Sequence, residues 1–181
     1  IISDNRYGVH HPTIPSIFIT HQLIIKAPYR WVQSIIQWVN YFFIKKFTAC
    51  WVPDMAAAPG LAGELSHPAK LPSIPVHYMK LLTRFHRVTC ATKYSFAVVL
   101  SGPEPQRTML ERKILKDLET YTKPVLLVRG LPAETASIEV PSHVTVFNHL
   151  DTIELANELQ QADYIISRGG YTSLMELISI D

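Results

Sequence analysis

The chain has 181 residues, of which 48% are hydrophobic and 18% are charged, which is the composition of one or two compact globular domains and excludes a disordered chain. Its formal net charge of +2, without a long Lys or Arg run, gives no basis for nucleic-acid binding. Two cysteines are too few for a disulfide framework, so a reducing compartment is expected.

The first half of the chain predicts short buried strands around one long helix. Short apolar runs that end in polar loops predict the strands. These strands are expected at residues 1–3, 16–20 and 49–52. Between residues 28 and 47, polar side chains recur three or four positions apart, which predicts an amphipathic helix. Residues 55–87 hold many prolines and glycines and predict an irregular linker.

Beyond this linker, strand-like and helix-like segments alternate. Strands are expected at residues 96–100, 125–128, 144–147 and 164–167, and helices at 106–121, at 152–161 and from 171 onward. This alternation predicts βαβ units on a parallel sheet. The expected fold class is therefore α/β, with a Rossmann-type parallel sheet in residues 86–181 and part of a second Rossmann-like lobe in residues 1–85.

The end of the chain carries the most informative motif. Residues 162–177 predict a buried strand, a turn at Gly169 and Gly170, and the first turns of a helix. Backbone N–H groups at such a helix start can face a phosphate, and Glu176, two turns further on, can reach a sugar diol. This pattern predicts a nucleotide-sugar site. The alternative is an ordinary strand-to-helix turn, with Glu176 exposed on its helix.

A second strand-to-helix loop occupies residues 101–107. Its prolines are expected to leave the N–H groups of Gln106 and Arg107 free to face a ligand, whereas a solvated Arg107 is the alternative. Arg168 follows an apolar strand directly and pairs either with a diphosphate or with a nearby carboxylate. Because both loops follow parallel strands, we expect them to converge at the carboxyl edge of the sheet, at a topological switch point.

Other polar residues also follow predicted strands. Main-chain groups at Asn148 could read a base and Phe147 could pack against it, although a plain turn explains the same residues. Asp151 could cap the next helix. His21 and Asp4 are the candidates for a general base, and a structural hydrogen bond is the alternative for His21. The eight histidines show no metal-ligand spacing, so we expect no metal.

The helix expected at residues 28–47 is rich in aromatic side chains, Trp31 and Trp38 among them, and these are flanked by Lys26, Lys45 and Lys46. Aromatic residues with basic flanks fit a helix that lies on a membrane surface. The helix is too short and too polar to span a bilayer. A core helix of the first lobe is the alternative.

Taken together, these segments resemble the GT-B glycosyltransferases of the family-28 type, which are related to the peptidoglycan UDP-N-acetylglucosamine transferase. The similarity lies in Ser-Gly-Pro-Glu-Pro-Gln-Arg at 101–107, Phe-Asn-His-Leu at 147–150 and Ile-Ser-Arg-Gly-Gly-Tyr-Thr at 166–172. Asp-Asn-Arg-Tyr-Gly at 4–8 and Thr-His-Gln at 20–22 resemble an uncharacterised bacterial branch of that family.

The resemblance implies an acceptor-side lobe with a linker at 1–85 and a UDP-sugar lobe at 86–181. It implies these donor contacts: Ser101, Gly102, Gln106 and Arg107 at the diphosphate, Phe147 and Asn148 at the uracil, Arg168, Gly169, Gly170 and Thr172 at the sugar-phosphate side, and Glu176 at the ribose. The implied reaction transfers a hexosyl or N-acetylhexosaminyl group from a UDP-sugar to a carbohydrate or lipid-linked acceptor, without a metal or cofactor. The implied location is the cytoplasm, at the inner face of the membrane.

This chain departs from the family pattern at both ends. The opening glycine loop of the first lobe, where such enzymes usually keep a catalytic base, is absent, and so is the region that would follow Asp181. We therefore expect the chain to be an internal piece of a larger protein. Two other functions fit the same residues. A UDP-sugar epimerase would act without an acceptor, and a non-catalytic membrane-docked subunit would bind UDP weakly.

Overall fold

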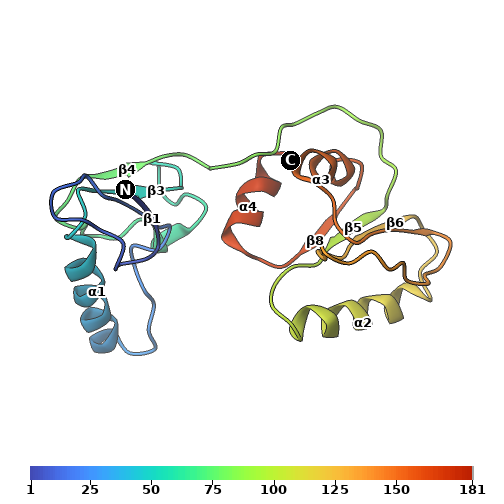
Figure 1. Cartoon of the computed structure of the whole chain (residues 1–181), viewed down its shortest axis with the longest axis horizontal. Helices are drawn as coiled ribbons and strands as arrows, with labels where there is room; N and C mark the ends of the chain where they lie inside the picture. Colours follow the sequence, from blue (N-terminus) through green and yellow to red (C-terminus); the bar gives the residue numbers. More distant parts are fainter. Residues whose placement is uncertain (181) are drawn as a thin grey trace. The chain divides into compact units, whose positions relative to one another are not determined.

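The computed structural model describes residues 1–180 and shows two compact α/β units, Ile1–Leu82 (unit 1) and Thr83–Asp181 (unit 2) (Figure 1). Each unit is built on a sheet of four parallel strands. The α/β class with Rossmann-like parallel sheets is thus confirmed. The contacts divide the chain between Leu82 and Thr83, a few residues before the boundary expected from the sequence.

Unit 1 has the strand order β1-β2-β3-β4, which is also the order along the chain. Its elements are β1 (Ile2–Asp4), β2 (Ile17–Ile19), α1 (Arg30–Ile44), β3 (Ala49–Val52), the 3-10 turn η1 (Gly63–Leu65) and β4 (Val76–Tyr78). The prediction of a continuous irregular segment at 55–87 is wrong at β4. Three residues with one exposed histidine in the middle are too short for an alternating pattern to stand out.

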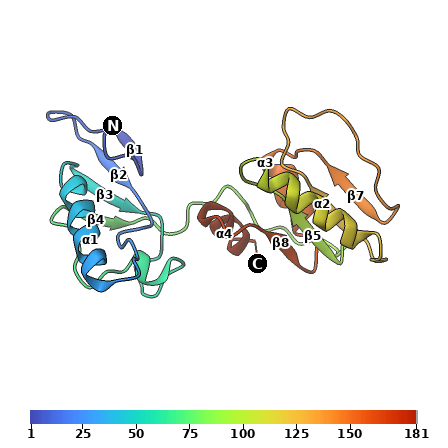
Figure 2. The same ribbon diagram turned by 90° about the horizontal axis from the view of Figure 1, so that it is seen from below.

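Helix α1 packs on one face of the unit 1 sheet. Its buried residue Ile44 joins Phe47 and the inward side chains of β2 and β3 in one hydrophobic cluster. The buried members of this cluster are Phe18, Leu23, Ile44, Phe47, Cys50 and Val52. Figure 2 shows α1 alongside β3 and β4. The alternative interpretation of α1 as a core helix is therefore correct for this face of the helix.

Unit 2 has the strand order β7-β6-β5-β8. Its elements are β5 (Phe96–Val99), α2 (Gln106–Leu118), β6 (Val125–Val128), β7 (Val144–Phe147), α3 (Thr152–Leu159), β8 (Ile165–Ser167) and α4 (Tyr171–Ile178). All seven lie where the sequence predicts them, with small differences at their ends. The chain first moves outward from β5 to β7 and then crosses to the other side of β5, so the winding direction reverses at β5.

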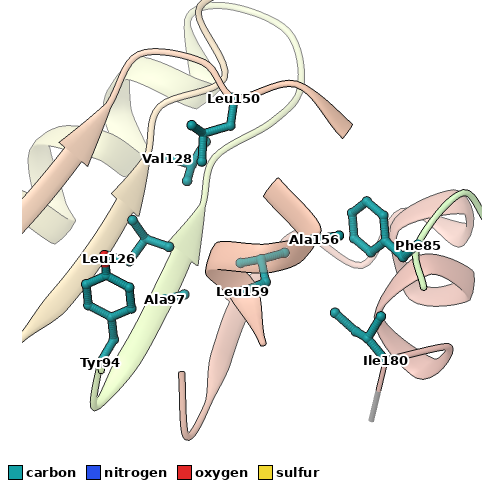
Figure 3. Close-up of a cluster of buried hydrophobic side chains, with 9 residues drawn as sticks. All are labelled: Phe85, Tyr94, Ala97, Leu126, Val128, Leu150, Ala156, Leu159 and Ile180. Atoms are coloured by element: carbon teal, nitrogen blue, oxygen red, sulfur yellow. The ribbon is translucent and has the colours of Figure 1, made fainter. Parts of the chain in front are cut away.

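Helices cover both faces of the unit 2 sheet. On one face, Leu118 of α2 packs with Val98, Leu127 and Val144 of the sheet. On the other face, Ala156 and other residues of α3 and α4 enclose a second cluster, which Figure 3 shows in close-up. Figure 1 shows α2 and α3 on opposite sides of the strands. This is the doubly wound arrangement in which ligand sites form where the strand order reverses.

The start of α3 follows from its sequence. The carboxylate of Asp151 accepts hydrogen bonds from the N–H groups of Ile153 and Glu154, at 2.8 Å each, and the Glu154 side chain accepts from the N–H of Asp151. This reciprocal capping box occupies otherwise unpaired helix donors. The prediction that Asp151 caps this helix is confirmed.

Candidate functional site

The two predicted loops meet at the switch point of unit 2. Strands β5 and β8 are parallel neighbours, with Val99 in register with Ser167, so their carboxyl ends lie side by side. The loop after β5 leads to α2 at Gln106 and the loop after β8 leads to α4 at Tyr171. Both helix starts therefore lie at one edge of the sheet, as the sequence predicted. We call this place the loop junction.

Arg168 joins the two loops. Its Nη1 donates a hydrogen bond to the Ser101 carbonyl at 3.2 Å, and its side chain lies against Gly102. Gly102 has a φ of +102°, and a Cβ there would lie 1.9 Å from Arg168 Nη1. The positive φ of Gly102 thus requires glycine, and the close approach of the Arg168 side chain also favours a residue without a Cβ. Arg168 is exposed, and a guanidinium with five N–H donors retains capacity for an anion.

The space above Gly169 and Gly170 is open. A Cβ at Gly169 would meet no atom within 4 Å, and at Gly170 it would meet only Ser173 Oγ at 3.8 Å. Neither residue has a positive φ, so neither backbone strain nor internal packing requires glycine here. Gly170 is the N-cap of α4, without a side-chain cap and without an acidic residue in the first turn. The positive end of the helix dipole is therefore accessible to an external anion.

A small cavity of about 40 Å³ lies at the loop junction. Its polar lining includes Ser101, Ser167, Ser173 and Glu176, and Phe85 contributes an apolar wall. This volume suits about one water molecule. Two residues implied by the resemblance, one from each loop region, therefore line the same cavity.

Glu176 is buried in this cavity wall and has a partner. Its Oε1 accepts hydrogen bonds from Nε and Nη2 of Arg84, at 2.9 and 2.7 Å. Only 9% of Glu176 is exposed, so the alternative of an exposed helix residue is wrong. A nearly buried carboxylate needs such a partner, because burial without one would be costly. The Arg84 pair uses Oε1 and leaves Oε2 outside this bidentate contact.

Contrary to the prediction, Arg107 does not face the loop junction. Its N–H donates to the Pro103 carbonyl at 3.2 Å, so the expectation of a free N–H is wrong. Its guanidinium is buried and contacts Glu104 Oε1 at 2.6 Å and Glu111 Oε2 at 3.2 Å, so the alternative of a solvated arginine is wrong as well. The physical reason is local, because Glu104 and Glu111, three residues before and four residues after Arg107, both accept hydrogen bonds from its guanidinium.

Glu104 further changes the start of α2. Its Oε2 accepts a hydrogen bond from the N–H of Thr108 at 3.2 Å, which places a carboxylate beside the first turn of the helix. The pKa of Glu104 lies below its usual value, because Thr108 and Arg107 donate hydrogen bonds to it. A phosphate at this helix start would meet a negative charge already in place. The two helix starts are therefore not equivalent, and α4 is the more accessible of the two.

Sequence reasoning missed a buried ion network at the same edge of the sheet. Arg129, at the end of β6, binds Glu111 Oε1 through Nε at 2.5 Å and Asn148 Oδ1 through Nη1 at 2.7 Å. Burial alone would raise the pKa of Glu111, but hydrogen bonds and attraction from Arg129 and Arg107 outweigh it and lower the pKa. The signal was visible, since Arg129 follows an apolar strand directly, as Arg168 does.

Phe147 and Asn148 lie at the end of β7, two strands from β5. Phe147 packs against the core, and the Asn148 side chain is engaged with Arg129 and with the carbonyls of Glu134 and Ala136. Their own carbonyls accept the N–H groups of Arg129 and Leu131. At a strand spacing of about 4.8 Å, these residues lie roughly 10 Å from β5 along the carboxyl edge. They share that edge with the loop junction but are not part of it.

The general-base candidates lie at the carboxyl edge of the unit 1 sheet. Asp4 ends β1, and His21 follows β2. Burial lowers the pKa of His21, and the negative charges of Asp4 and Asp54 oppose this shift. Asp54 is fully buried. Its carboxylate accepts hydrogen bonds from Met55, Leu61, Ala62 and Ser66. Asp54 therefore organises the following loop, while Asp4 is exposed beside His21.

Within residues 1–180, no group of three or more His, Cys, Asp or Glu side chains is arranged to hold a metal ion. No helix in the same part of the chain has the length and apolar character needed to cross a bilayer. Comparisons of the chain with protein-family models, with curated proteins and with solved structures found no match.

Proposed function

We propose that the chain is a glycosyltransferase of the GT-B type that uses a UDP-sugar, and that unit 2 binds this donor at the loop junction. The observation that carries the proposal is the convergence of two strand-to-helix loops at the reversal of the strand order, where Arg168 reaches across to Ser101. Open α/β sheets bind their ligands outside the carboxyl ends of the strands at such a point.

The diphosphate is proposed to lie over Gly169 and Gly170 at the start of α4. Packing within the protein does not require glycine at these two positions. A ligand that approaches the backbone closely would require it, because only glycine leaves the space above the backbone open. The N-terminal end of α4 and the Arg168 guanidinium both favour negative charge there. We assign α2 a smaller part, limited to Gln106, because Glu104 and Arg107 already occupy its first turn.

The ribose is proposed to lie toward Glu176. Arg84 fixes the carboxylate through Oε1, and Oε2 is proposed to accept hydrogen bonds from hydroxyl groups of a sugar. Thr172, which is exposed in the first turn of α4, is proposed to contact the phosphates. The uracil would then extend along the carboxyl edge toward Phe147 and Asn148, on the far side of β6.

In the proposed reaction, a base deprotonates the acceptor hydroxyl while the leaving diphosphate gains negative charge. Arg168 and the start of α4 stabilise that charge, which is electrostatic catalysis by groups already oriented in the ground state. His21, in unit 1, is the candidate for a base that the sequence offers. Burial lowers its pKa, so it is neutral and able to accept a proton at neutral pH, and Asp4 stabilises the imidazolium that results.

Calorimetric titration with UDP, UDP-glucose and UDP-N-acetylglucosamine tests the donor site. Gly169→Ala is the sharpest variant, because its added methyl group meets no protein atom and should leave stability unchanged. We expect it to weaken UDP binding about tenfold or more, equivalent to ~1.4 kcal/mol. Gly8→Ala is the matched control, since a Cβ at Gly8 also meets nothing within 4 Å, and it should bind UDP as the native chain does.

Arg168→Ala and Glu176→Ala separate the two halves of the donor. Arg168→Ala should weaken UDP binding but leave uridine binding nearly unchanged, because its charge acts on the diphosphate. Glu176→Ala should weaken the binding of both UDP and uridine. Thermal unfolding of this variant is measured in parallel, because Arg84 loses its partner. Absence of UDP binding by the native chain, or equal affinities of Gly169→Ala and Gly8→Ala, would refute the donor site.

A further inference from the structure

Helix α1 has a second apolar face that the fold does not use. Trp31, Ile35, Trp38 and Phe42 follow one another at intervals of four, three and four residues, which places them on one side of a helix. They are 68%, 55%, 69% and 40% exposed. The buried residues of α1, Asn40 among them, lie on the other side. We call these four residues the α1 stripe.

The exposed tryptophans need an explanation beyond folding. The core of unit 1 is already formed by the other face of α1, and large apolar side chains in a continuous row are a liability in water. Scattered single apolar residues are common on protein surfaces, but a row with two tryptophans is typical of an interaction surface. The α1 stripe is therefore a candidate for contact with another molecule.

The charge around the stripe selects the partner. No Asp or Glu occurs between residues 5 and 53, whereas this segment holds five Lys and Arg residues. Of these, Lys45 lies 4.6 Å from the ring centroid of Phe42, and Lys46 lies 5.1 Å from that of Phe43. Arg30 is exposed at the other end of the helix. The stripe thus has cations at both ends and no carboxylate along its length.

We propose that the α1 stripe docks unit 1 onto an anionic phospholipid bilayer, with α1 lying in the plane of the membrane. Tryptophan favours the membrane interface because its ring is apolar and its N–H can remain hydrated. The ammonium groups of Lys45 and Lys46 lie over the rings of Phe42 and Phe43, and at a membrane these flexible side chains can turn toward lipid phosphates. A helix with an apolar face, basic ends and no acidic residues is the form that interfacial binding requires.

The surroundings of Trp38 extend this surface. Trp38 and Tyr41 line a cavity of about 390 Å³, mostly apolar, beside the stripe. Lys70, which is exposed, lies at the same cavity, and the Tyr41 hydroxyl donates to its carbonyl at 2.6 Å. A further cation thus lies on the side of α1 where Trp38 is exposed. The docking proposal does not depend on the glycosyltransferase function.

Vesicle flotation tests the docking. The full chain is mixed with vesicles of phosphatidylcholine alone or of phosphatidylcholine with about 30% phosphatidylglycerol, which is anionic. We expect binding to the anionic vesicles, weakened by high salt because charge attraction contributes. Trp31→Ala with Trp38→Ala should weaken it about tenfold or more, since each exposed indole loses its apolar contact with the lipid.

The matched control is Met109→Ala with Tyr164→Ala, which removes two large side chains of unit 2 that are 65% and 75% exposed. It should float as the native chain does. Lys45→Glu with Lys46→Glu should reduce binding to anionic vesicles. Because all four tested apolar side chains are exposed, both double alanine variants should keep the native far-UV circular dichroism spectrum.

Three results would overturn the proposal. The first is a native chain that binds neither kind of vesicle. The second is vesicle binding that the Trp31 and Trp38 changes leave intact. The third is a dimer in analytical ultracentrifugation that these changes convert to a monomer, which would show that a second copy of the chain covers the α1 stripe.

Discussion

The two units use the same kinds of element but differ in how the chain is wound. In unit 2 the strand order reverses at β5, and helices cover both faces of the sheet. In unit 1 the described strands follow one another in chain order, and α1 packs on one face. Only a reversal separates two adjacent loops enough to form a crevice at the sheet edge. Of the two described sheets, the one in unit 2 therefore has the reversal of strand order at which open α/β sheets bind ligands.

The units also differ in how they hold buried charge. Unit 2 pairs Glu111 with Arg129 and Arg107, side chain against side chain. Unit 1 surrounds the carboxylate of Asp54 with backbone N–H groups and the Ser66 hydroxyl. The first solution connects α2 with the end of β6, whereas the second shapes one loop. Each therefore predicts a different response to substitution.

The largest expected effect is in the unit 2 network. Arg129→Met should destabilise unit 2 by about 3–5 kcal/mol, because it leaves Glu111 buried without its closest partner. Urea denaturation followed by far-UV circular dichroism measures this loss. All three tryptophans, at positions 31, 38 and 51, belong to unit 1, so tryptophan fluorescence reports unit 1 separately. An equal shift in both signals would contradict the assignment of this network to unit 2 alone.

Removing both charges gives the internal control. Arg129→Met combined with Glu111→Leu eliminates the unpaired carboxylate, so part of the lost stability should return. A double variant less stable than Arg129→Met would show that the hydrogen bond that Arg107 donates to Glu111 outweighs the cost of burying the Glu111 charge.

Asp54→Asn should have the next largest effect, in unit 1. An amide cannot accept all the hydrogen bonds that the carboxylate accepts, and its NH2 group would face backbone N–H donors. We expect a loss of about 2–4 kcal/mol, seen mainly in tryptophan fluorescence. Glu64→Gln is the control, because its ion pair with Lys26 lies at the surface, where water screens the charges, and we expect no measurable change in the tryptophan-monitored transition. Similar losses for both variants would contradict the structural role of Asp54.

These two cases show how much of the molecule could be predicted from sequence. The unit 2 strands could be predicted because β5 and β6 are continuous apolar runs bounded by turn residues. The convergence of the loops followed from strand direction alone. The partners of Arg129 and Glu176 could not be predicted, because they lie 18 and 92 residues away in the chain and no local pattern records such pairings. The carboxylate partners of Arg107 lie three residues before it and four residues after it, so a local pattern could have indicated them.

A smaller effect is expected at Gly102. Alanine there would have to adopt a φ of +102° and displace the end of the Arg168 side chain. We expect a loss of about 1–2 kcal/mol in the unit 2 transition, most of it from the backbone, since Arg168 can rotate away. Gly169→Ala, with neither constraint, should stay within ~0.5 kcal/mol of the native chain. The reverse order of these two losses would contradict the described loop junction.

The smallest expected effect concerns His21, at the carboxyl edge of the unit 1 sheet. Burial lowers the pKa of His21 in the folded state, so folding favours the neutral ring. Its contribution is present above the unfolded pKa of about 6.5 and is lost as pH falls through the folded pKa. His21→Gln should therefore reduce the fall in unit 1 stability between pH 7 and pH 5.

Asp4→Asn should lower the pKa of His21 further in an NMR titration, because a negative charge that stabilises the imidazolium is gone. An unchanged or raised pKa would separate Asp4 from His21 and remove the pair as the proposed base, while leaving the donor site of unit 2 untouched.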